Sequence, residues 1–318
     1  MINFLFSFFL RIALLLVPAL FILPAKAQTI WFGPHVTSPD YLNLFHSDAP
    51  WQHLAAHVQV FCTSASKLLD PSVKKDLPNL LADLRRRHID LEVGLLPLTG
   101  LGEGQCGYHV EGYSAPGQPL SDAIRLKAAG ADIRYLGMDE PLYYGHVFNG
   151  KDACHASIAE IAKDVAVKVK QVQSIYPGVA VGDVEPMGIS DGAWLNELEQ
   201  WFDAYQAASG QRLAFFRVDM QWSADWQSQM RQLGALLRRK GIPLQIIYNG
   251  SGNAGSDENW IAQAVEHFQQ YQASGLPRPD AVVFQCWTPN PTHILPESDP
   301  RTMTGLINQY LQWKHSHP

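Results

Sequence analysis

The chain has 318 residues, of which 24 are lysine or arginine and 30 are aspartate or glutamate, and its formal net charge is −6. An acidic chain lacks the positive field that collects phosphates, so this balance argues against a nucleic acid or an anionic membrane as partner. A neutral or cationic ligand is compatible with it.

The N-terminal residues 1–27 resemble an export signal. Arg11 precedes the apolar run Ile12–Leu23, and the small residues of Ala25-x-Ala27 follow, as signal peptidase requires. We therefore predict cleavage before Gln28 and an exported protein, periplasmic or secreted, with no stable membrane insertion after processing. The alternative is a retained anchor, because the apolar N-terminal stretch reaches the roughly 20 residues that cross a bilayer.

Residues 28–318 fit one α/β domain, a (β/α)8 TIM barrel, which typically needs about 250 residues. No Ser/Gly-rich linker or block of charge divides them, and strand-like and helix-like segments alternate eight times. The predicted strands are Thr29–Gly33, Val58–Thr63, Leu91–Leu96, Ile133–Asp139, Val179–Val184, Leu213–Met220, Leu244–Tyr248 and Ala281–Cys286. The predicted helices are Pro50–His57, Asp70–Arg87, Leu120–Ala129, Asp152–Ile175, Asp191–Ala208, Ser223–Arg239, Asp257–Ala273 and Arg301–Lys314.

The turn after the first strand separates a closed barrel from an open doubly wound sheet. An open sheet that binds a nucleotide is expected to carry GxGxxG at this turn. Here the turn reads Gly33-Pro34-His35-Val36, so the nucleotide-binding interpretation loses its main support. The short connections between each helix and the next strand also favour the closed barrel.

Four cysteines allow three complete pairings, and spacing alone does not choose among them. The loops after the third and fourth predicted strands are neighbours on one rim of a barrel, which favours a disulfide between Cys106 and Cys154. Cys62 and Cys286 are expected to be free, buried thiols. No pair has the close CxxC spacing of a zinc site, and we predict no metal.

Three consecutive strands end on acidic residues, at the edge where (β/α)8 barrels place their active sites. Such an acid can instead cap a helix or pair with an arginine, and Asp183 could pair with Arg217 on the next strand. Five carboxylates together would repel one another and raise at least one pKa, which is what a general acid needs near neutral pH. The five are Asp139, Glu140, Asp183, Glu185 and Asp219, and Gln221 shares a face with the last of them.

Aromatic and amide side chains near the strand ends indicate a carbohydrate ligand. Flat aromatic faces pack against the C–H faces of sugar rings, while polar groups hydrogen-bond the hydroxyls. For Trp31 a place in the core is an equally good explanation, and a lone histidine such as His35 is more often structural. The full set is Trp31, His35, Tyr143, Tyr144, Trp222, Tyr248, Asn249, Gln285 and Trp287.

The end of the fourth strand, Asp139-Glu140-Pro141, resembles the Asn-Glu-Pro signature of the large clan of (β/α)8-barrel glycoside hydrolases. In that clan the glutamate is the acid/base and the preceding asparagine holds the 2-hydroxyl of the substrate. The resemblance therefore implies that Glu140 is the acid/base and that Asp139 takes the place of the asparagine.

The chain departs from the clan at the end of the seventh strand. The clan places its nucleophilic glutamate there, whereas this sequence continues Tyr248-Asn249-Gly250-Ser251, and the next acid is Asp257, which we interpret as a helix cap. Glycoside hydrolysis needs two carboxyl groups. We therefore predict Glu185 as base or nucleophile, with Asp219 as the second choice.

These observations leave three hypotheses. The first is an exported glycoside hydrolase that cleaves an oligo- or polysaccharide through Glu140 and Glu185. The second is a barrel that binds glycan without cleaving it, and the third is a cell-envelope protein whose rim binds another protein. No motif indicates a nucleotide, flavin, haem or zinc site, so we predict no cofactor.

Overall fold

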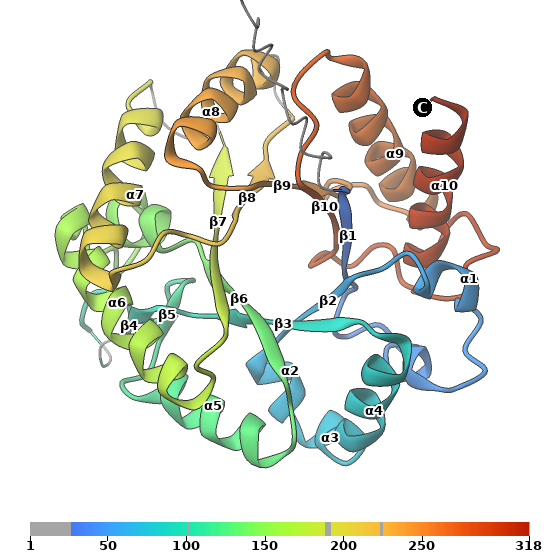
Figure 1. Cartoon of the computed structure of the whole chain (residues 1–318), viewed down its shortest axis with the longest axis horizontal. Helices are drawn as coiled ribbons and strands as arrows, with labels where there is room; N and C mark the ends of the chain where they lie inside the picture. Colours follow the sequence, from blue (N-terminus) through green and yellow to red (C-terminus); the bar gives the residue numbers. More distant parts are fainter. Residues whose placement is uncertain (1–26, 101, 103, 188–191, 223–224, 318) are drawn as a thin grey trace, which may run out of the picture.

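The computed structural model describes residues 27–317 except 101, 103, 188–191 and 223–224. The predicted export signal lies outside the described residues, apart from its last position. The strands of the main sheet are β1 (Thr29–Gly33), β2 (Val60–Ser64), β3 (Asp90–Leu95), β6 (Ile133–Asp139), β7 (Ala180–Met187), β8 (Phe216–Met220), β9 (Leu244–Tyr248) and β10 (Ala281–Gln285). They pair in parallel and close in the order β1-β10-β9-β8-β7-β6-β3-β2, which confirms the (β/α)8 barrel (Figure 1).

Helices form a ring around the barrel (Figure 1). They are α1 (Gln52–Ala55), α2 (Ala65–Leu69), α3 (Pro71–Lys74), α4 (Leu77–Arg87), α5 (Gln118–Ala128), α6 (Ile158–Ile175), α7 (Trp194–Ser209), α8 (Trp226–Lys240), α9 (Asp257–Ala273) and α10 (Met303–Ser316). The short helical segments η1 (Leu42–Phe45) and η2 (Tyr143–Val147) and the two-stranded pair β4 (Leu98–Thr99) and β5 (Tyr113–Ser114) lie in connecting loops.

Several predicted helices have other bounds than those observed; α6, for example, begins at Ile158 and not at Asp152. Two of the differences have a clear local cause. The predicted helix Asp70–Arg87 is divided into α3 and α4, because Pro78 cannot donate to the carbonyl of Lys74, and its ring would clash with that carbonyl in a continuous helix. At the start of α9 the cap is Ser256, whose hydroxyl accepts from a backbone N–H, and not Asp257. The Asp257 carboxylate instead accepts hydrogen bonds from the loop after β10.

Alternating side chains of the strands build two separate cores. Those that point outward pack under the helices in the larger core, to which Phe32, Phe216 and Phe284 belong. Those that point inward form a smaller core inside the barrel, made of Trp31, Val60, Cys62, Phe215, Ile247, Ala281 and Val283. A strand residue therefore faces either the helices or the barrel axis, and only the second direction leads to the central cavity.

A buried ion pair crosses the interior of the barrel. Arg217 Nη2 donates to Glu92 Oε2 at 2.8 Å, and Arg217 Nε donates to Gln245 Oε1 at 2.9 Å. The guanidinium lies 5.1 Å from the ring centre of Trp31. Asp183 points away from this network, so the pairing of Asp183 with Arg217 that the sequence allowed does not form.

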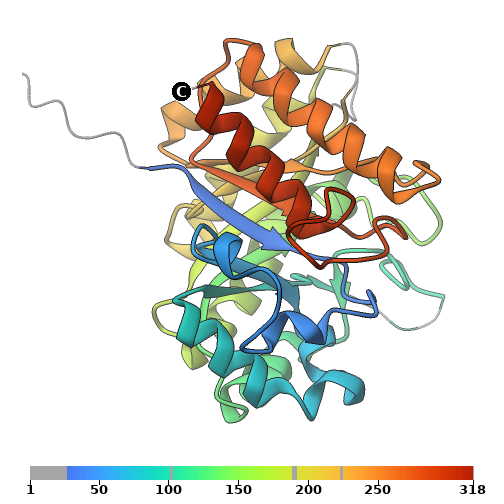
Figure 2. The same ribbon diagram turned by 90° about the vertical axis from the view of Figure 1, so that its right-hand side faces the viewer.

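Figure 2 shows the barrel from the side, with the arrowhead of β1 pointing toward the end where the loop before α10 projects. All strands of the barrel run parallel, so their carboxyl ends share this rim. The acidic strand ends of the sequence are thus gathered at one end of the molecule.

Candidate active site

The carboxyl ends of β6, β8 and β10 surround a cavity of about 440 Å³, which we name the acidic cavity. Among the described residues its lining contains four carboxylates and no lysine, arginine or histidine. The lining residues are Glu111, Asp139, Glu140, Tyr143, Tyr144, Val184, Pro186, Asp219, Gln221, Ile247, Gln285 and Trp287. This position at the rim is where (β/α)8 barrels carry out chemistry.

Two of the carboxylates enter the cavity because their strands direct them inward. Asp219 lies two residues after Arg217 on β8, so both side chains point toward the barrel axis. Asp139 is the last residue of β6 and lies two residues after Gly137, where an added Cβ would meet the carboxylate of Glu92 inside the barrel. Both placements follow from strand periodicity.

Glu140 reaches the cavity by a different route, through a turn of the backbone. Its φ is +47°, in the left-handed region that non-glycine residues seldom adopt. Its N–H donates to the carbonyl of Val184 at 3.1 Å, and its own carbonyl accepts from the N–H of Tyr144 at 2.9 Å. Strand β6 therefore ends at Asp139, and Glu140 begins the turn into η2, with its side chain in the acidic cavity.

Glu185, our predicted second catalytic group, does not line this cavity. It points outward from β7 and is 0% exposed. Its Oε1 accepts from the N–H of Leu142 at 2.7 Å, and its Oε2 accepts from the N–H of Tyr143 at 3.1 Å. With both oxygens bound to the backbone and no path to a substrate, Glu185 fixes the segment that follows Glu140. The structure thus separates the predicted catalytic pair.

Asp183 is buried in the same outer layer. Its Oδ2 accepts a hydrogen bond from Trp201 Nε1 of α7 at 2.7 Å, and its exposed fraction is 0%. The sequence placed Asp183 in contact with substrate, whereas the structure puts its carboxyl between the barrel and a helix. Desolvation raises the pKa of both Asp183 and Glu185, as expected for carboxyls without a cationic partner.

The three carboxyls at the ends of β6 and β8 have raised pKa values. Burial, followed by repulsion from Asp219 and Asp139, raises the pKa of Glu140 to about 9. Burial and the charges of Glu111 and Asp219 raise the pKa of Asp139 to about 7. The pKa of Asp219 rises to about 6, through burial and then Glu111. Near pH 7, Glu140 therefore holds a proton, while Asp219 is mostly ionised.

Glu111 completes the acidic cavity, and no pattern in the sequence indicated it. Its Oε2 accepts a hydrogen bond from the hydroxyl of Tyr144 at 2.5 Å. The neighbouring Gly112 has φ +78°, and a Cβ there would lie 2.8 Å from the carbonyl oxygen of Asp139. Only glycine lets the loop approach β6 this closely. Glu111 lies in the glycine-rich segment 99–117; the glycines indicate a loop but do not single out this glutamate.

The same loop is tied to the loop after β6 by a disulfide between Cys106 and Cys154, the pairing that the sequence favoured. The N–H of Gly107 also donates to the carbonyl of Asp152 at 2.6 Å. Cys62 and Cys286 are free and buried. The disulfide thus anchors the segment that brings Glu111 over the acidic cavity.

Five more of the predicted ligand-binding residues line the acidic cavity. Tyr143 and Tyr144 come from η2, Gln221 follows β8, Gln285 ends β10, and Trp287 lies two residues beyond it. Trp287 is 47% exposed, which is unusual for a residue with so large an apolar side chain. The cavity therefore combines aromatic faces, amides and carboxyls.

A neighbouring cavity of about 380 Å³ holds two other predicted residues, Trp222 and Asn249. We name it the neutral cavity, since no carboxylate, lysine or arginine lines it among the described residues. Its lining is Met220, Trp222, Asn249, Gly250, Ser251, Gly252, Gln263, His267, Trp287 and Thr288. Trp287 lines both cavities.

Besides Asp183, three predicted ligand-binding residues lie in neither of these cavities. Trp31 is 4% exposed and packs in the inner core against Tyr135 and Phe215. Tyr248 points outward and is 0% exposed in the outer core, because it occupies the opposite face of β9 from Ile247. His35 is half-buried, with Nδ1 2.9 Å from the hydroxyl of Thr37. Trp31 and Tyr248 therefore belong to the core, and His35 contacts a neighbouring loop residue and neither cavity.

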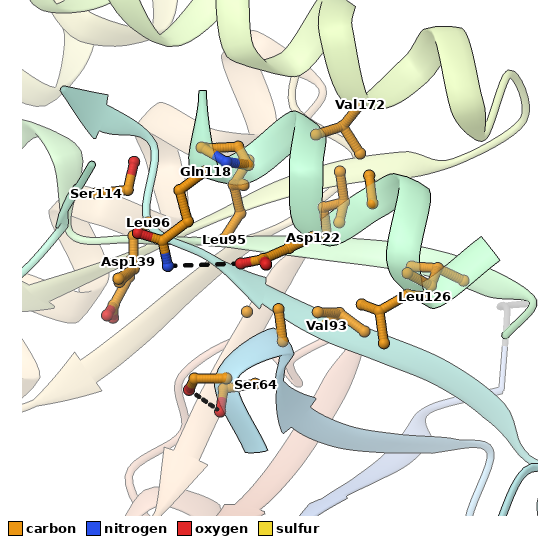
Figure 3. Close-up of a pocket in the computed structure, with 17 residues that line it drawn as sticks. Ser64, Val93, Leu95, Leu96, Ser114, Gln118, Asp122, Leu126, Asp139 and Val172 are labelled. Carbon is orange, nitrogen blue, oxygen red and sulfur yellow. Dashed lines mark hydrogen bonds between the residues drawn. The ribbon is translucent and has the colours of Figure 1, made fainter. Parts of the chain in front are cut away.

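A third cavity, of about 270 Å³, lies between α2 and α5 on the outer side of β3 (Figure 3). Its lining is mostly aliphatic and includes Val93, Leu95, Leu126 and Val172. Asp139 contributes to this aliphatic cavity as well as to the acidic one. Apolar groups on one side of its carboxyl give a physical reason for the strong desolvation of Asp139.

No cluster of three or more His, Cys, Asp or Glu side chains arranged to hold a metal ion occurs in the described part of the chain. Within the same residues, no helix is long and apolar enough to cross a membrane.

Comparison with solved structures shows what the fold is similar to. GH5_18 from Streptomyces cattleya, in complex with GlcNAc, gives a TM-score of 0.52 at 13% identity, over 92% of this chain and 82% of that one. A fungal beta-1,4-galactanase gives a TM-score of 0.51 at 12% identity, over 81% of this chain and 89% of the galactanase. The beta-mannanase of Thermomonospora fusca gives a TM-score of 0.48 at 16% identity, over 81% of this chain and 78% of the mannanase.

Comparisons of the sequence itself are less informative. No protein-family model matches the chain, and no curated protein matches it either. At identities this low the structural likenesses establish the fold alone, because (β/α)8 barrels host many unrelated activities. The chain is thus a TIM barrel, and the galactanase and GH5_18 are glycoside hydrolases that share this fold.

Proposed function

We propose that this chain is a glycoside hydrolase whose proton donor is Glu140. The observation that carries the proposal is the position of Glu140 in the acidic cavity, with a pKa raised to about 9 by burial and by its acidic neighbours. A carboxyl that keeps its proton at neutral pH can protonate the leaving oxygen of a glycosidic bond. The solved galactanase and GH5_18 show that this fold is compatible with the same class of reaction.

Asp219 replaces Glu185 in this proposal as the second carboxyl group. It lines the same cavity as Glu140, and its pKa of about 6 leaves it mostly ionised at pH 7. Glu185 has both oxygens bound to backbone N–H groups and is sealed from the cavity. Asp219 therefore has the protonation state and the access that Glu185 lacks.

The reaction needs one proton donor and one ionised carboxylate. Glu140 gives its proton to the glycosidic oxygen while the bond from that oxygen to the anomeric carbon breaks. While that bond breaks, Asp219 either takes a proton from the attacking water or bonds to the anomeric carbon. In the second case water later displaces Asp219 and gives its proton to Glu140, which is now ionised. The first route inverts the anomeric configuration and the second retains it, so the product configuration distinguishes them.

The other residues of the acidic cavity fit a carbohydrate ligand. Tyr143, Tyr144 and Trp287 supply aromatic faces, and Gln221 and Gln285 supply amides that donate to and accept from hydroxyls. Asp139 and Glu111 add acceptors and raise the pKa of Glu140. No basic side chain of the described residues lines the cavity, which argues against a substrate that carries phosphate or carboxylate at this point.

We further infer that the protein acts after export. The disulfide between Cys106 and Cys154 fits an oxidising compartment, and the N-terminal signal predicted from the sequence fits export. N-terminal sequencing of the mature protein is expected to begin at Gln28. A mature protein that retains Arg11 and the apolar run would support the membrane anchor.

The test of the proposed function is turnover of a glycan panel, followed by Glu140→Gln on the best substrate. The amide cannot donate the carboxyl proton, so turnover should fall roughly 10²–10⁴-fold while the glycan still binds. Glu199→Gln on the exposed face of α7 is a matched control that should leave turnover unchanged. Undiminished turnover in Glu140→Gln would refute the role of Glu140, and binding without product from any glycan would favour the non-catalytic barrel.

A further inference from the structure

The neutral cavity adjoins the acidic cavity without sharing its chemistry. Trp287 lines both and is 47% exposed. At about 380 Å³, the neutral cavity lies near the lower end of the range of roughly 300–1,000 Å³ that is usual for ligand pockets. It opens beside the end of β9, where the sequence has Asn249–Gly252 and no acid.

Its polar groups are neutral hydrogen-bonding groups. Ser251 and Thr288 contribute hydroxyls, and Gln263 contributes an amide. His267 Nδ1 lies 2.8 Å from the carbonyl of Asn249, so it carries the proton and donates. Burial lowers the pKa of His267 below its usual 6.5, so the imidazole is neutral at pH 7. The cavity thus offers hydroxyls and amides beside indoles, with no net charge.

Helix α9 holds the floor of this cavity in place. The N–H of Ser251 donates to Gln263 Oε1 at 2.7 Å, and Asn259 Nδ2 donates to the carbonyl of Ala254 at 3.1 Å. Trp222 stacks on the ring of His267, with centroids 4.2 Å apart and planes 5° from parallel. A site fixed in this way loses little conformational freedom when a ligand binds.

We propose that the neutral cavity is a subsite for one neutral sugar unit, next to the unit held in the acidic cavity, and that Trp287 contacts both units. The substrate is then a chain of sugars and not a single glycoside. This inference rests on the proposed function, because it takes the acidic cavity as the place where the glycosidic bond lies.

The chemistry of the cavity favours a neutral sugar over charged ligands. Without arginine or lysine in its lining, the cavity cannot compensate a phosphate or a uronic acid, and without a carboxylate it cannot compensate an ammonium group. An uncharged pyranose needs an apolar surface for its C–H groups and neutral partners for its hydroxyls. Trp222 and Trp287 meet the first need, while Ser251 and Gln263 meet the second.

Gly252 offers a way to fill the neutral cavity and leave the acidic one intact. A Cβ added there meets Cγ2 of Thr288 at 3.5 Å, an ordinary van der Waals contact, and the φ of Gly252 is not in the left-handed region. Gly252→Ala is therefore tolerated and serves as the matched control. Gly252→Leu and Gly252→Trp extend progressively larger side chains beside Thr288.

The experiment measures glycan binding by calorimetry in the Glu140→Gln background, where turnover does not interfere. The probes are β-1,4-linked tetrasaccharides of glucose, mannose, galactose and N-acetylglucosamine. We expect at least one to bind, with Gly252→Ala unchanged, Gly252→Leu weaker, and Gly252→Trp weaker by about tenfold or more. Unchanged binding in a folded Gly252→Trp, or no binding of any probe by the parent, would overturn the proposal. If Gly252→Trp does not fold, binding by Gly252→Leu is the test: weaker binding supports the proposal and unchanged binding overturns it.

Cleavage assays with Glu140 in place keep the two proposals apart. Binding that weakens along the Gly252 series, without cleavage of any probe, would support the subsite and refute hydrolysis. Cleavage that Gly252→Trp leaves unaffected would support hydrolysis and refute the subsite.

Discussion

The ends of β6 and β7 have similar sequences and opposite structural roles. Gly137 and Gly182 are register partners, and after each of them the chain carries an aspartate, a glutamate and a proline. In β6 the strand stops at Asp139, and Glu140 turns into the acidic cavity with φ +47°. In β7 the strand continues to Met187, so Glu185 keeps its outward direction and is sealed.

The comparison shows that the point where a strand stops decides whether an acid reaches the acidic cavity or is buried outside the barrel. The spacing also matters, because Asp183 and Glu185 are two residues apart and share the outward face. Asp139 and Glu140 are adjacent, so one is directed inward by the strand and the other by the turn. The buried Glu185 then holds the segment that follows Glu140, through the N–H groups of Leu142 and Tyr143.

The largest change in activity is expected at Asp219, the inward carboxylate on the strand next to β7. Asp219→Asn should lower kcat roughly 10²–10⁴-fold, since the amide cannot act as base or nucleophile. Steady-state kinetics on the best glycan measure this loss, with circular dichroism as a check of the fold. A kcat close to that of the unsubstituted protein would mean that Asp219 is not the second carboxyl group, and Asp139 would be the remaining candidate.

The next effect concerns the stability of the protein and tests whether Glu185 of β7 supports the segment that follows Glu140. Glu185→Ala leaves the N–H groups of Leu142 and Tyr143 buried without an acceptor, so it should lower the free energy of unfolding by about 3 kcal/mol or more. Urea denaturation measures this, and Glu199→Ala on the surface should leave the free energy of unfolding nearly unchanged. Equal stability of the two variants would contradict a supporting role for Glu185.

The pH dependence of kcat/KM should follow the two raised carboxyls. Asp219 must be ionised, so activity should fall as the pH drops below about 6, and Glu140 must be protonated, so activity should fall as the pH rises above about 9. Both values belong to interacting groups and appear as the two limbs of one profile. An alkaline limb near 5 would show that Glu140 has an ordinary pKa and is not the proton donor.

The smallest expected effect comes from Glu111. Its charge contributes to the raised pKa of Asp219, so Glu111→Gln should move the acidic limb to lower pH, by less than about one unit. Tyr144→Phe, which removes the hydrogen bond to Glu111 and keeps the charge, is the control for the loop position. A shift toward higher pH would contradict the assigned repulsion.

The sequence was sufficient to predict the barrel and the rim, because strand periodicity and turn residues are local properties. Strands β1, β6 and β9 have the predicted bounds, and Asp139, Glu140 and Asp219 line the acidic cavity as expected. The burial of Glu185 could not be predicted, because it depends on which face of β7 meets the barrel axis and on the strand continuing past Val184, its predicted end.

The position of Glu111 and the direction of Tyr248 depend on long-range packing, so they could not be predicted from the sequence either. Glu111 reaches the site through a loop without periodicity, whose path is set by a disulfide and by the contact of Gly112 with β6. The outward direction of Tyr248 depends on which face of β9 meets the barrel axis, and a shift of one residue would reverse it. The alternation of side chains along β9 does not by itself show which of its two faces points inward.

The most direct test of this account is a paired measurement of turnover in Glu140→Gln and Glu185→Gln, with the same glycan and under the same conditions. We predict that the first variant loses roughly 10²–10⁴-fold, while the second keeps at least about a tenth of the activity if it remains folded. A loss of equal size in a fully folded Glu185→Gln, with Glu140→Gln still active, would contradict the account.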